Sequence, residues 1–483
     1  MKRRDFLRMT TYGVMASALP LIFCDANKKR RSKQPNIIFI MADDLGYGHL
    51  GCYGQKKIRT PNLDQFSSEG MRFTQCYAGS PVCAPSRSVL MTGMHCGHTS
   101  VRGNSGGIPI LPGDVTIGEV LKQGGYTTGI FGKWGLGDIG TTGVPNKQGF
   151  DEFFGYLHQV HCHFYYPYYL WENDKKYLLP GNEGHKRQQY THDIIVDKAL
   201  NFIRTNKGGP FFLYLPFTIP HTELLVPEDS FREYEGKFPE LNPYVDPRGH
   251  YADQPAPRTT FAAMVTRMDR DIGRIMALLK ELKIDEDTIV FYTSDNGGQM
   301  SGGPDLEFFQ GNRELRAGKG QLYEGGIRVP MIVRWPGKIG AGLVNDHVWA
   351  FWDVMPTLAD LAGVEISHSI DGISVVPTLL GQEKVGRQQQ KHDFLYWEHP
   401  RGKDLMQAVR MDDWKAVLLK GDGQLELYNL KDDIGEKKSV ASEQPKIVNE
   451  IEVYLKTART EPRKYKPQPQ TAGLKREETG YIR

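Results

Sequence analysis

The chain has 483 residues and the composition of an ordinary globular protein, with 60 Lys and Arg against 57 Asp and Glu. This near balance gives no electrostatic basis for nucleic-acid binding, so any preference for anions must be local. A single core usually stops growing at roughly 250–300 residues, and we therefore expect two domains. The six cysteines form no C-x-x-C pair and are too scattered for a disulfide scaffold; whether Cys52, Cys76 and Cys96 pair with one another stays open.

The first residues predict a targeting segment. A basic stretch at 2–8 precedes an apolar run from Tyr12 to Phe23 that is too short to span a bilayer comfortably. The pattern resembles a twin-arginine export signal, and we expect an exported, periplasmic protein whose signal and linker occupy residues 1–34. Cleavage of the signal and lipidation of Cys24 both stay open. Membrane attachment is expected only if Cys24 is lipidated.

From about residue 35 to 381 the sequence predicts an α/β domain with a large, mostly parallel sheet and helices on both of its faces, because apolar strands alternate with amphipathic helices. Strands are predicted at 36–41, 126–131, 211–215 and 289–293. Helices are predicted from 114–116 to the stop at Gly124, over 194–203, and along the apolar stripe Met264, Met268, Ile272, Ile275 and Leu279.

The pattern changes after Gly381. A polar stretch leads into short apolar segments around 394–397, 406–410, 414–419 and 425–428, followed by a helix over 445–459. These features predict a smaller C-terminal domain, residues 382–462, with an antiparallel sheet and one helix. The basic tail, residues 463–483, is expected to be loosely ordered.

The most informative motif is Cys83-Ala84-Pro85-Ser86-Arg87, which opens a short apolar helix. The N–H groups of a helix start favour negative charge, and Arg87 adds a fixed fork of donors, so the motif suits an anion. It resembles the signature of the type I sulfatases, which begins C-x-P-S-R. In that family the cysteine is converted to formylglycine, whose hydrated aldehyde is the nucleophile. The resemblance therefore implies a formylglycine made from Cys83 and a maturation enzyme that installs it.

Two oxygen-rich pairs, Asp43-Asp44 and Asp295-Asn296, each follow an apolar strand directly. Oxygen side chains without histidine or thiol suit Ca²⁺ or Mg²⁺ and not zinc. Such pairs are also common in turns, so neither pair alone identifies a metal site. Together they resemble the calcium site of the sulfatases, in which both pairs and the modified cysteine, here Cys83, bind the metal.

Further segments resemble sulfatase motifs in the same order along the chain. The stretch from Gly125 to Trp134 resembles the second family signature and implies that Lys133 holds a sulfate oxygen. Lys319 corresponds to the second sulfate-binding lysine, and His221 to the histidine near the bridging oxygen, where it can protonate the leaving alcohol. With Arg87, the two lysines would form a cationic site for the sulfate ester.

One position departs from the family. The second signature often carries a histidine two residues after the lysine, and this chain has Gly135 there, which can neither accept nor relay a proton. The loop 158–167, rich in histidine and tyrosine, is the candidate replacement, and loops of this kind suit sugar recognition. We therefore predict substrate contacts from His161, His163, Arg102 and Asn104. A packed aromatic loop without contact to substrate is the alternative.

The resemblance covers about residues 35–459 and implies the fold of the alkaline phosphatase superfamily. We expect a sulfatase that acts on sulfated sugars of the galactose or N-acetylgalactosamine type, with bound Ca²⁺, or Mg²⁺ in its place. Two alternatives remain from the sequence: a phosphatase or phosphodiesterase of the same superfamily, and a noncatalytic protein that binds sulfated glycans and never acquires the aldehyde.

Overall fold

The computed structural model describes residues 34–104, 108–247, 249, 251–421 and 423–464. The predicted export signal, Cys24 and nearly all of the basic tail lie outside the described residues. Within the described part, no helix is both long and apolar enough to cross a membrane. The five cysteines of this part are free thiols, so Cys52, Cys76 and Cys96 do not pair with one another.

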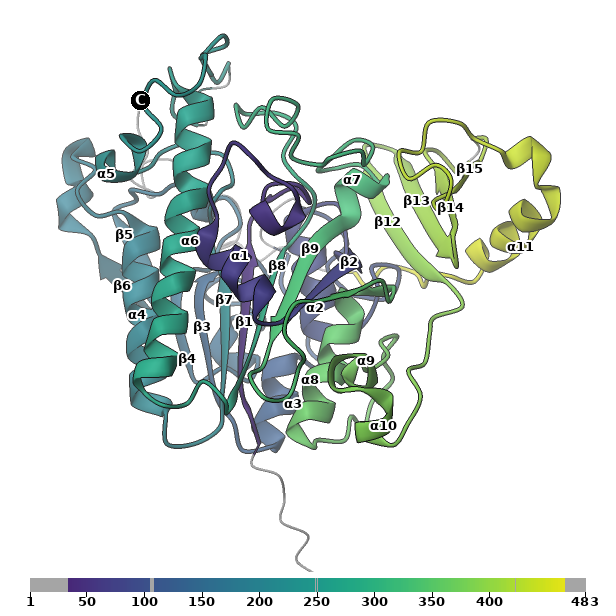
Figure 1. The fold of residues 1–483 in the computed structure, drawn as a ribbon, viewed down its shortest axis with the longest axis horizontal. Coiled ribbons are helices and arrows are strands. Elements are labelled where there is room, and N and C mark those ends of the chain that lie inside the picture. Colours follow the sequence, from purple (N-terminus) through teal and green to yellow (C-terminus); the bar gives the residue numbers. More distant parts are fainter. Residues whose placement is uncertain (1–33, 105–107, 248, 250, 422, 465–483) are drawn as a thin grey trace, which may run out of the picture. The chain divides into compact units, whose positions relative to one another are not determined.

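A large sheet carries the fold (Figure 1), and among the described residues it has 11 strands in the order β10-β2-β9-β8-β1-β7-β3-β4-β5-β6, with β11 beside β2. The central run β8-β1-β7-β3-β4 is parallel throughout. Strand β9 is antiparallel to both of its neighbours, and β5 and β6 form an antiparallel edge. The predicted large, mostly parallel sheet is confirmed. Its strands are β1 (Asn36–Ala42), β2 (Met71–Tyr77), β3 (Thr127–Lys133), β4 (Glu152–Tyr156), β5 (Tyr169–Glu172), β6 (Lys175–Leu178), β7 (Phe211–Pro216), β8 (Thr288–Ser294), β9 (Arg328–Arg334), β10 (Leu343–Asn345) and β11 (Trp349–Ala350).

Helices cover both faces of the sheet. Successive residues of a strand point to opposite faces, and β1 shows this directly: Ile37 and Phe39 join one buried apolar cluster, Ile38 and Ile40 the other. The first cluster includes residues of α2, α3 and α8, and the second includes residues of α1, α4 and α6. Figure 1 shows α1 and α6 lying across one side of the strands. The helices are α1 (Pro61–Ser68), α2 (Cys83–Thr92), α3 (Ile117–Gln123), α4 (Thr191–Asn206), α5 (Glu228–Phe231), α6 (Pro257–Glu281), α7 (Glu324–Ile327), α8 (Val354–Ala362), α9 (Val376–Leu380) and α10 (Gln382–Val385).

The start of α3 shows how the sequence sets an element boundary. The Thr116 hydroxyl accepts the N–H of Glu119 at 3.3 Å, and the Glu119 carboxylate accepts the N–H of Thr116 at 2.9 Å. This reciprocal pair is a capping box, which satisfies two N–H groups that the first helical turn leaves without partners. The predicted helix start at 114–116 is confirmed.

A separate antiparallel sheet follows, in the order β12-β13-β14-β15. Its strands are β12 (Leu395–Arg401), β13 (Asp404–Met411), β14 (Trp414–Leu418) and β15 (Glu426–Asn429), and α11 (Pro445–Leu455) comes after them. One face of this small sheet packs on α11 through Tyr396, Leu427 and Ile451. The opposite face, with Trp397 and Val417, belongs to the core of the large sheet. The antiparallel sheet with one helix is as predicted; the division at residues 381 and 382 stays a prediction.

Candidate active site

The two acidic pairs meet at the carboxyl ends of adjacent strands. β1 and β8 are parallel neighbours with Ala42 opposite Ser294, so the residues that follow them leave the sheet side by side. The N–H of Asp44 donates to the Asp295 carboxylate at 3.1 Å. This is the edge of an open α/β sheet at which ligands generally bind.

Helix α2 begins at Cys83 and brings its sulfur to this edge. The Cys83 Sγ lies 3.2 Å from Asp43 Oδ1 and 3.8 Å from Asp44 Oδ1. Ligand atoms of Cys83, Asp43, Asp44 and Asp295 all lie within 4.8 Å of one another. Ser86, one turn into the helix, fixes this arrangement by donating from its hydroxyl to the backbone oxygen of Asp295 at 2.5 Å.

The residues present fit a hard divalent cation. Asn296 donates from Nδ2 to Asp44 Oδ1 at 2.8 Å, while its Oδ1 is buried and has no hydrogen-bond partner among the described residues. A buried amide oxygen without a partner is costly and indicates a missing ligand. Carboxylate and amide oxygens are the donors that Ca²⁺ and Mg²⁺ prefer.

Three cationic side chains face the three carboxylates. Arg87 contacts Asp295 at 2.8 Å and donates to the backbone oxygen of Lys133 at 2.8 Å. The Lys133 ammonium lies 2.7 Å from the Asp43 carboxylate, and the Lys319 ammonium lies 2.6 Å from that of Asp44. Burial opposes the charge of each lysine, but Asp43 and Asp44 outweigh it and raise the pKa values of Lys133 and Lys319 above the ordinary range. Both ammonium groups therefore stay charged.

The thiol of Cys83 is a poor nucleophile as it stands. Burial, together with the nearby Asp295 and Asp43 carboxylates, raises its pKa well above the ordinary value for cysteine. The thiol therefore stays protonated at neutral pH, and a protonated thiol does not act as a nucleophile.

His221 lies against Asp44, with its Nε2 3.3 Å from the carboxylate and its Nδ1 bonded to the backbone oxygen of Thr222. Burial and the Lys319 ammonium lower the pKa of His221, and Asp44 opposes them. The negative charge of a bound anion would offset the effect of Lys319 and favour the protonated ring.

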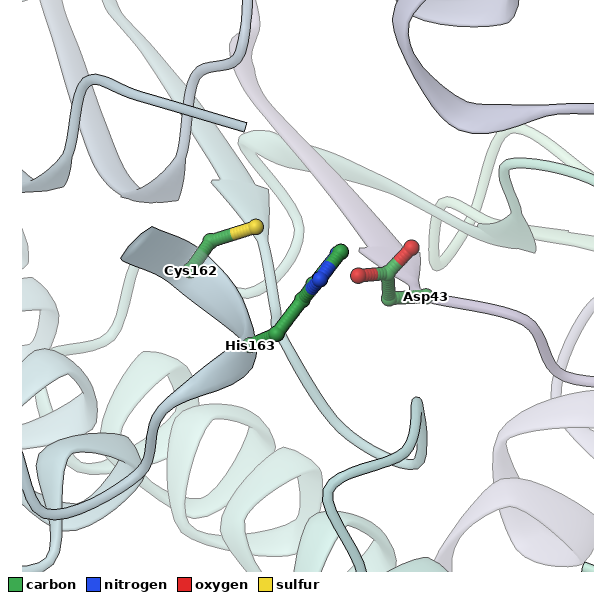
Figure 2. Close-up of side chains that lie close together, drawn as sticks. All are labelled: Asp43, Cys162 and His163. Atoms are coloured by element: carbon green, nitrogen blue, oxygen red, sulfur yellow. The ribbon is translucent and has the colours of Figure 1, made fainter. Parts of the chain in front are cut away.

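The structure explains why position 135 carries no side chain. Gly135 has a φ of 77°, in the left-handed region, and a Cβ added there would lie 2.5 Å from the Oε1 of Gln159. The loop that contains Gln159 continues into a short 3-10 helix, His161–His163. In Figure 2 the His163 ring points from this helix toward Asp43, with the Cys162 sulfur nearby. Ligand atoms of all three lie within 4.8 Å of one another. Sequence reasoning missed Cys162, although its place between two histidines of the polar loop was a signal.

Two of the predicted substrate contacts, His161 and Arg102, have their observed partners outside this cluster. The buried His161 ring packs on the rings of Tyr156 and Tyr169, with centroids 5.0 and 4.7 Å away. The guanidinium of Arg102 donates to the backbone oxygens of Thr99 and Thr460. The His161 ring thus packs on neighbouring parts of its own region, whereas Arg102 links its segment to Thr460 and to Glu398 of β12, 3.4 Å away. Contact with substrate stays a prediction for both.

Asn104 contributes to the site indirectly. Its Oδ1 accepts the N–H of Ala84 at 3.0 Å and so caps the first turn of α2 beside Cys83. A side-chain oxygen at this place satisfies one of the N–H groups that a helix start leaves open. The geometry thus gives Asn104 a role in holding the helix start, and contact with substrate stays a prediction.

Comparison with known proteins agrees with this geometry. The family model described as Sulfatase matches residues 35–364, and the model described as N-sulphoglucosamine sulphohydrolase, C-terminal, matches residues 317–462. The chain is 34% identical over 421 residues to N-acetylgalactosamine-6-sulfatase of Canis lupus familiaris, covering 79% of this chain and 71% of the relative. It is 30% identical over 507 residues to N-acetylgalactosamine-6-O-sulfatase of Bacteroides thetaiotaomicron, covering 89% and 94%. The crystal structure of Ps i-CgsB in complex with k-i-k-neocarrahexaose superposes with a TM-score of 0.75 at 30% identity, covering 91% of this chain and 96% of that one.

The fold and the acidic edge of the sheet define a hydrolase of the alkaline phosphatase superfamily. Within it, this chain belongs to the sulfatase family and is an enzyme that hydrolyses sulfate esters. The predictions of family, fold class and enzyme class are confirmed. The two alternatives, a phosphatase or phosphodiesterase and a noncatalytic glycan-binding protein, are not confirmed.

Proposed function

We propose that this sulfatase removes sulfate from O-sulfated sugars of the galactose or N-acetylgalactosamine type, with Cys83 converted to formylglycine beside one bound Ca²⁺. The observation that carries the proposal is the position of Cys83, at a helix start and 3.2 Å from Asp43. Two lysines and an arginine lie around the same carboxylates.

Asp43, Asp44, Asp295 and Asn296 would hold the cation together with the modified side chain at position 83. The formylglycine hydrate would supply the hydroxyl that attacks sulfur, and the bound cation would favour the ionisation of that hydroxyl. Mg²⁺ has the same preference for oxygen ligands and is the alternative occupant.

The remaining roles follow from charge and position. A sulfate ester carries one negative charge, and Arg87, Lys133 and Lys319 supply three positive charges to bind and orient it. Lys133 is paired with the Asp43 carboxylate, and Lys319 is paired with the Asp44 carboxylate. His221, beside Asp44, would donate a proton to the departing alcohol.

The substrate class rests on the relatives, two of which are named N-acetylgalactosamine-6-sulfatase or N-acetylgalactosamine-6-O-sulfatase. The structure of Ps i-CgsB was determined with a neocarrahexaose. Residues 1–34, with the basic start and apolar run noted above, support export to the periplasm, and lipidation of Cys24 would add membrane attachment. A separate maturation enzyme is the partner that the proposal requires.

The test combines mass spectrometry with a substrate screen. The peptide containing Cys83 from the native host should have the mass of formylglycine, and the matured protein should release sulfate from position-defined sulfated galactose or N-acetylgalactosamine. Matched aryl sulfate and aryl phosphate esters serve as controls for the reaction class. An intact thiol in a fully active preparation, or preference for the phosphate ester, would contradict the proposal.

A further inference from the structure

Beyond the groups assigned above, His163 makes the closest ring contact with the proposed acid. We infer that His163 is a positioning residue, whose imidazole ring holds that of His221 in the orientation needed to donate a proton to the leaving alcohol. The inference rests on the proposed role of His221.

The two rings stack face to face. Their centroids are 3.9 Å apart and their planes differ by 12°. They come from different parts of the chain, His163 from the 3-10 helix His161–His163 and His221 from the segment after β7. Both are at least nine-tenths buried, with 8% and 2% of their surface exposed. At this separation any tilt of the His221 ring brings its edge into the His163 ring, so the stack restricts rotation of His221.

The edge of the His221 ring is held by polar contacts. Its Nδ1 bonds to the Thr222 backbone oxygen, and its Nε2 lies 3.3 Å from Asp44. Both contacts are made through nitrogens at the edge of the ring, whereas His163 covers a face of the ring. The stack with His163 supplies the missing restraint on the face of the ring.

His163 is itself fixed. The Tyr251 hydroxyl lies 3.2 Å from its Nδ1, within hydrogen-bond distance. The neighbouring Cys162 donates from Sγ to the backbone oxygen of Gln159 at 2.7 Å, which ties the start of the short helix to the preceding loop. A support that is anchored on two sides can orient a second ring, whereas a mobile one cannot.

The cluster of Asp43, Cys162 and His163 in Figure 2 also has the residue types of a metal site, but its charge argues against one. The Lys133 ammonium lies 2.7 Å from Asp43 and interacts with the Cys162 sulfur as well. Asp43 is already assigned to the first cation, so a second cation at this place would be repelled both by that cation and by the Lys133 ammonium. Positioning of His221 is therefore the better account of His163.

The inference has a kinetic signature. A sugar alkoxide is a poor leaving group and needs a proton as it departs, whereas p-nitrophenolate is stable without one. Misplacing the acid should therefore slow hydrolysis of a sugar sulfate more than that of p-nitrophenyl sulfate. General acid catalysis typically contributes about 10²–10⁴-fold to rate, so a misplaced His221 should lose part of this rate enhancement.

The experiment measures kcat and KM of the matured enzyme on a sulfated monosaccharide and on p-nitrophenyl sulfate. For His163→Ala we expect kcat on the sugar to fall about 10–100-fold, at least about tenfold more than kcat on the aryl ester, with KM on the sugar within about threefold. His163→Phe keeps a flat ring without ring nitrogens, and it should recover most of the loss. If the alanine variant does not fold, His163→Leu takes its place.

A matched control comes from a second stacked pair outside the site, His95 and His98, whose ring centroids are 4.0 Å apart. His98→Ala should leave the ratio of sugar to aryl activity unchanged. The double variant His163→Ala/His221→Ala should be no slower on the sugar than His221→Ala alone, because residues that act as one unit are not additive.

Equal losses on both substrates, a phenylalanine variant as slow as the alanine variant, or a further loss in the double variant would each overturn the inference. Failure of the proposed function gives a different result. If His221→Ala itself slows both substrates equally, His221 is not the acid. If the loss of kcat in His221→Ala is larger for the sugar sulfate than for the aryl sulfate, and the loss in His163→Ala is not, only the role of His163 is refuted.

Discussion

At the scale of single residues, the site is a cluster in which charges compensate one another. Asp43, Asp44 and Asp295 are fully or almost fully buried, and each has a cationic partner within 2.8 Å. Removing one partner leaves a buried charge uncompensated, which is costly. Tests of function at this site are therefore best made with residues that carry no charge, such as Cys83 and Asn296.

Replacement of Cys83 by alanine should abolish turnover, with a loss of at least about a thousandfold in kcat, because the proposed nucleophile is made from this side chain. The fold should remain, since the change removes one buried sulfur atom. Activity and the melting temperature are measured together. The control is Cys52→Ala, a thiol outside the cluster, which should keep activity within about twofold. A Cys83→Ala protein as active as the parent would refute the assignment.

Asn296→Ala should lower the affinity for Ca²⁺ by at least about tenfold, because it removes a buried amide oxygen that we propose as a ligand of the cation. The measurement is the rise in melting temperature with Ca²⁺ concentration, since a ligand that binds only the folded state stabilises it. Asn206→Ala, at the end of α4, is the matched control and should respond like the parent. An unchanged Ca²⁺ response in Asn296→Ala would exclude that side chain as a ligand.

At the scale of elements, the sequence predicted best the central strands, which are continuous runs of buried, mostly apolar residues. β1, β7 and β8 are wholly buried apolar runs, and each of their predictions agrees with the structure to within one residue at either end. Other strands of the sheet were not predicted, among them β2 and β9 inside it and the short edge strands β6 and β10. β2 alternates between buried and half-buried residues, and it pairs with β9 in a register that joins Met71 to Val333. Such pairing is fixed by tertiary contacts, and short edge strands carry a weak local signal.

The same division applies to the site. Asp43 and Asp295 directly follow predicted strands, and their resemblance to the sulfatase calcium site made them candidate ligands; the parallel pairing of β1 and β8 brings the two residues together. The two histidines of the loop have different surroundings. His163 lies with Asp43 and Cys162, whereas the ring of His161, two residues earlier, packs on the ring of Tyr169. Nothing local distinguishes the two histidines, because the 3-10 helix between them sets their directions.

Thr116→Ala tests the capping box at the start of α3. The hydroxyl accepts the N–H of Glu119 and donates to the backbone oxygen of Gln148, and Thr116 is fully buried. The change should lower the free energy of unfolding by about 1–3 kcal/mol, with kcat within about twofold. Urea unfolding gives the stability. Thr142→Ala, an exposed threonine whose hydroxyl donates to the backbone oxygen of Ile110, is the control and should cost less. An unchanged stability would mean that the cap contributes nothing.

At the scale of the whole molecule, a buried ionic cluster joins the small sheet to the large one. Lys415 of β14 lies 2.9 Å from Glu324 of α7 and 3.5 Å from Glu436, and all three are fully buried. Tyr77 of β2 donates to Glu324 at 2.7 Å. One lysine thus faces two carboxylates, and the pKa values of these two carboxyl groups shift in opposite directions. Burial opposes the charge of Glu324, but Lys415 and Arg328 lower its pKa to about 2. Burial raises the pKa of Glu436 to about 7.

The raised pKa of Glu436 predicts a loss of stability with rising pH. Between about 4.5, the ordinary value, and about 7, the folded chain keeps a proton that the unfolded chain has released. Folding then takes up a proton, so stability falls as pH rises through this interval and stays low above it. Glu436→Gln should reduce the difference in unfolding free energy between pH 5 and pH 8 by about 1–3 kcal/mol. Urea unfolding at the two pH values measures it.

The control for this comparison is Glu443→Gln, an exposed carboxylate that should leave the pH dependence of the parent unchanged. Other buried groups contribute to the slope as well, and Glu223 has a pKa raised to about 7 by burial. Only the difference between variant and parent therefore tests Glu436. An identical slope in Glu436→Gln would show that this carboxyl is ionised in the folded protein.

The complete burial of Cys83 sets an order of events in the life of the protein. None of its surface is exposed, and every residue of α2 around it is buried. A second protein can reach this side chain only if helix α2 separates from the two strand ends that enclose it. A catalyst that alters this cysteine must therefore meet the polypeptide while it is still open, during or soon after synthesis. If Cys83 is modified as proposed, a molecule that folds before the modification would keep the native fold and lack activity.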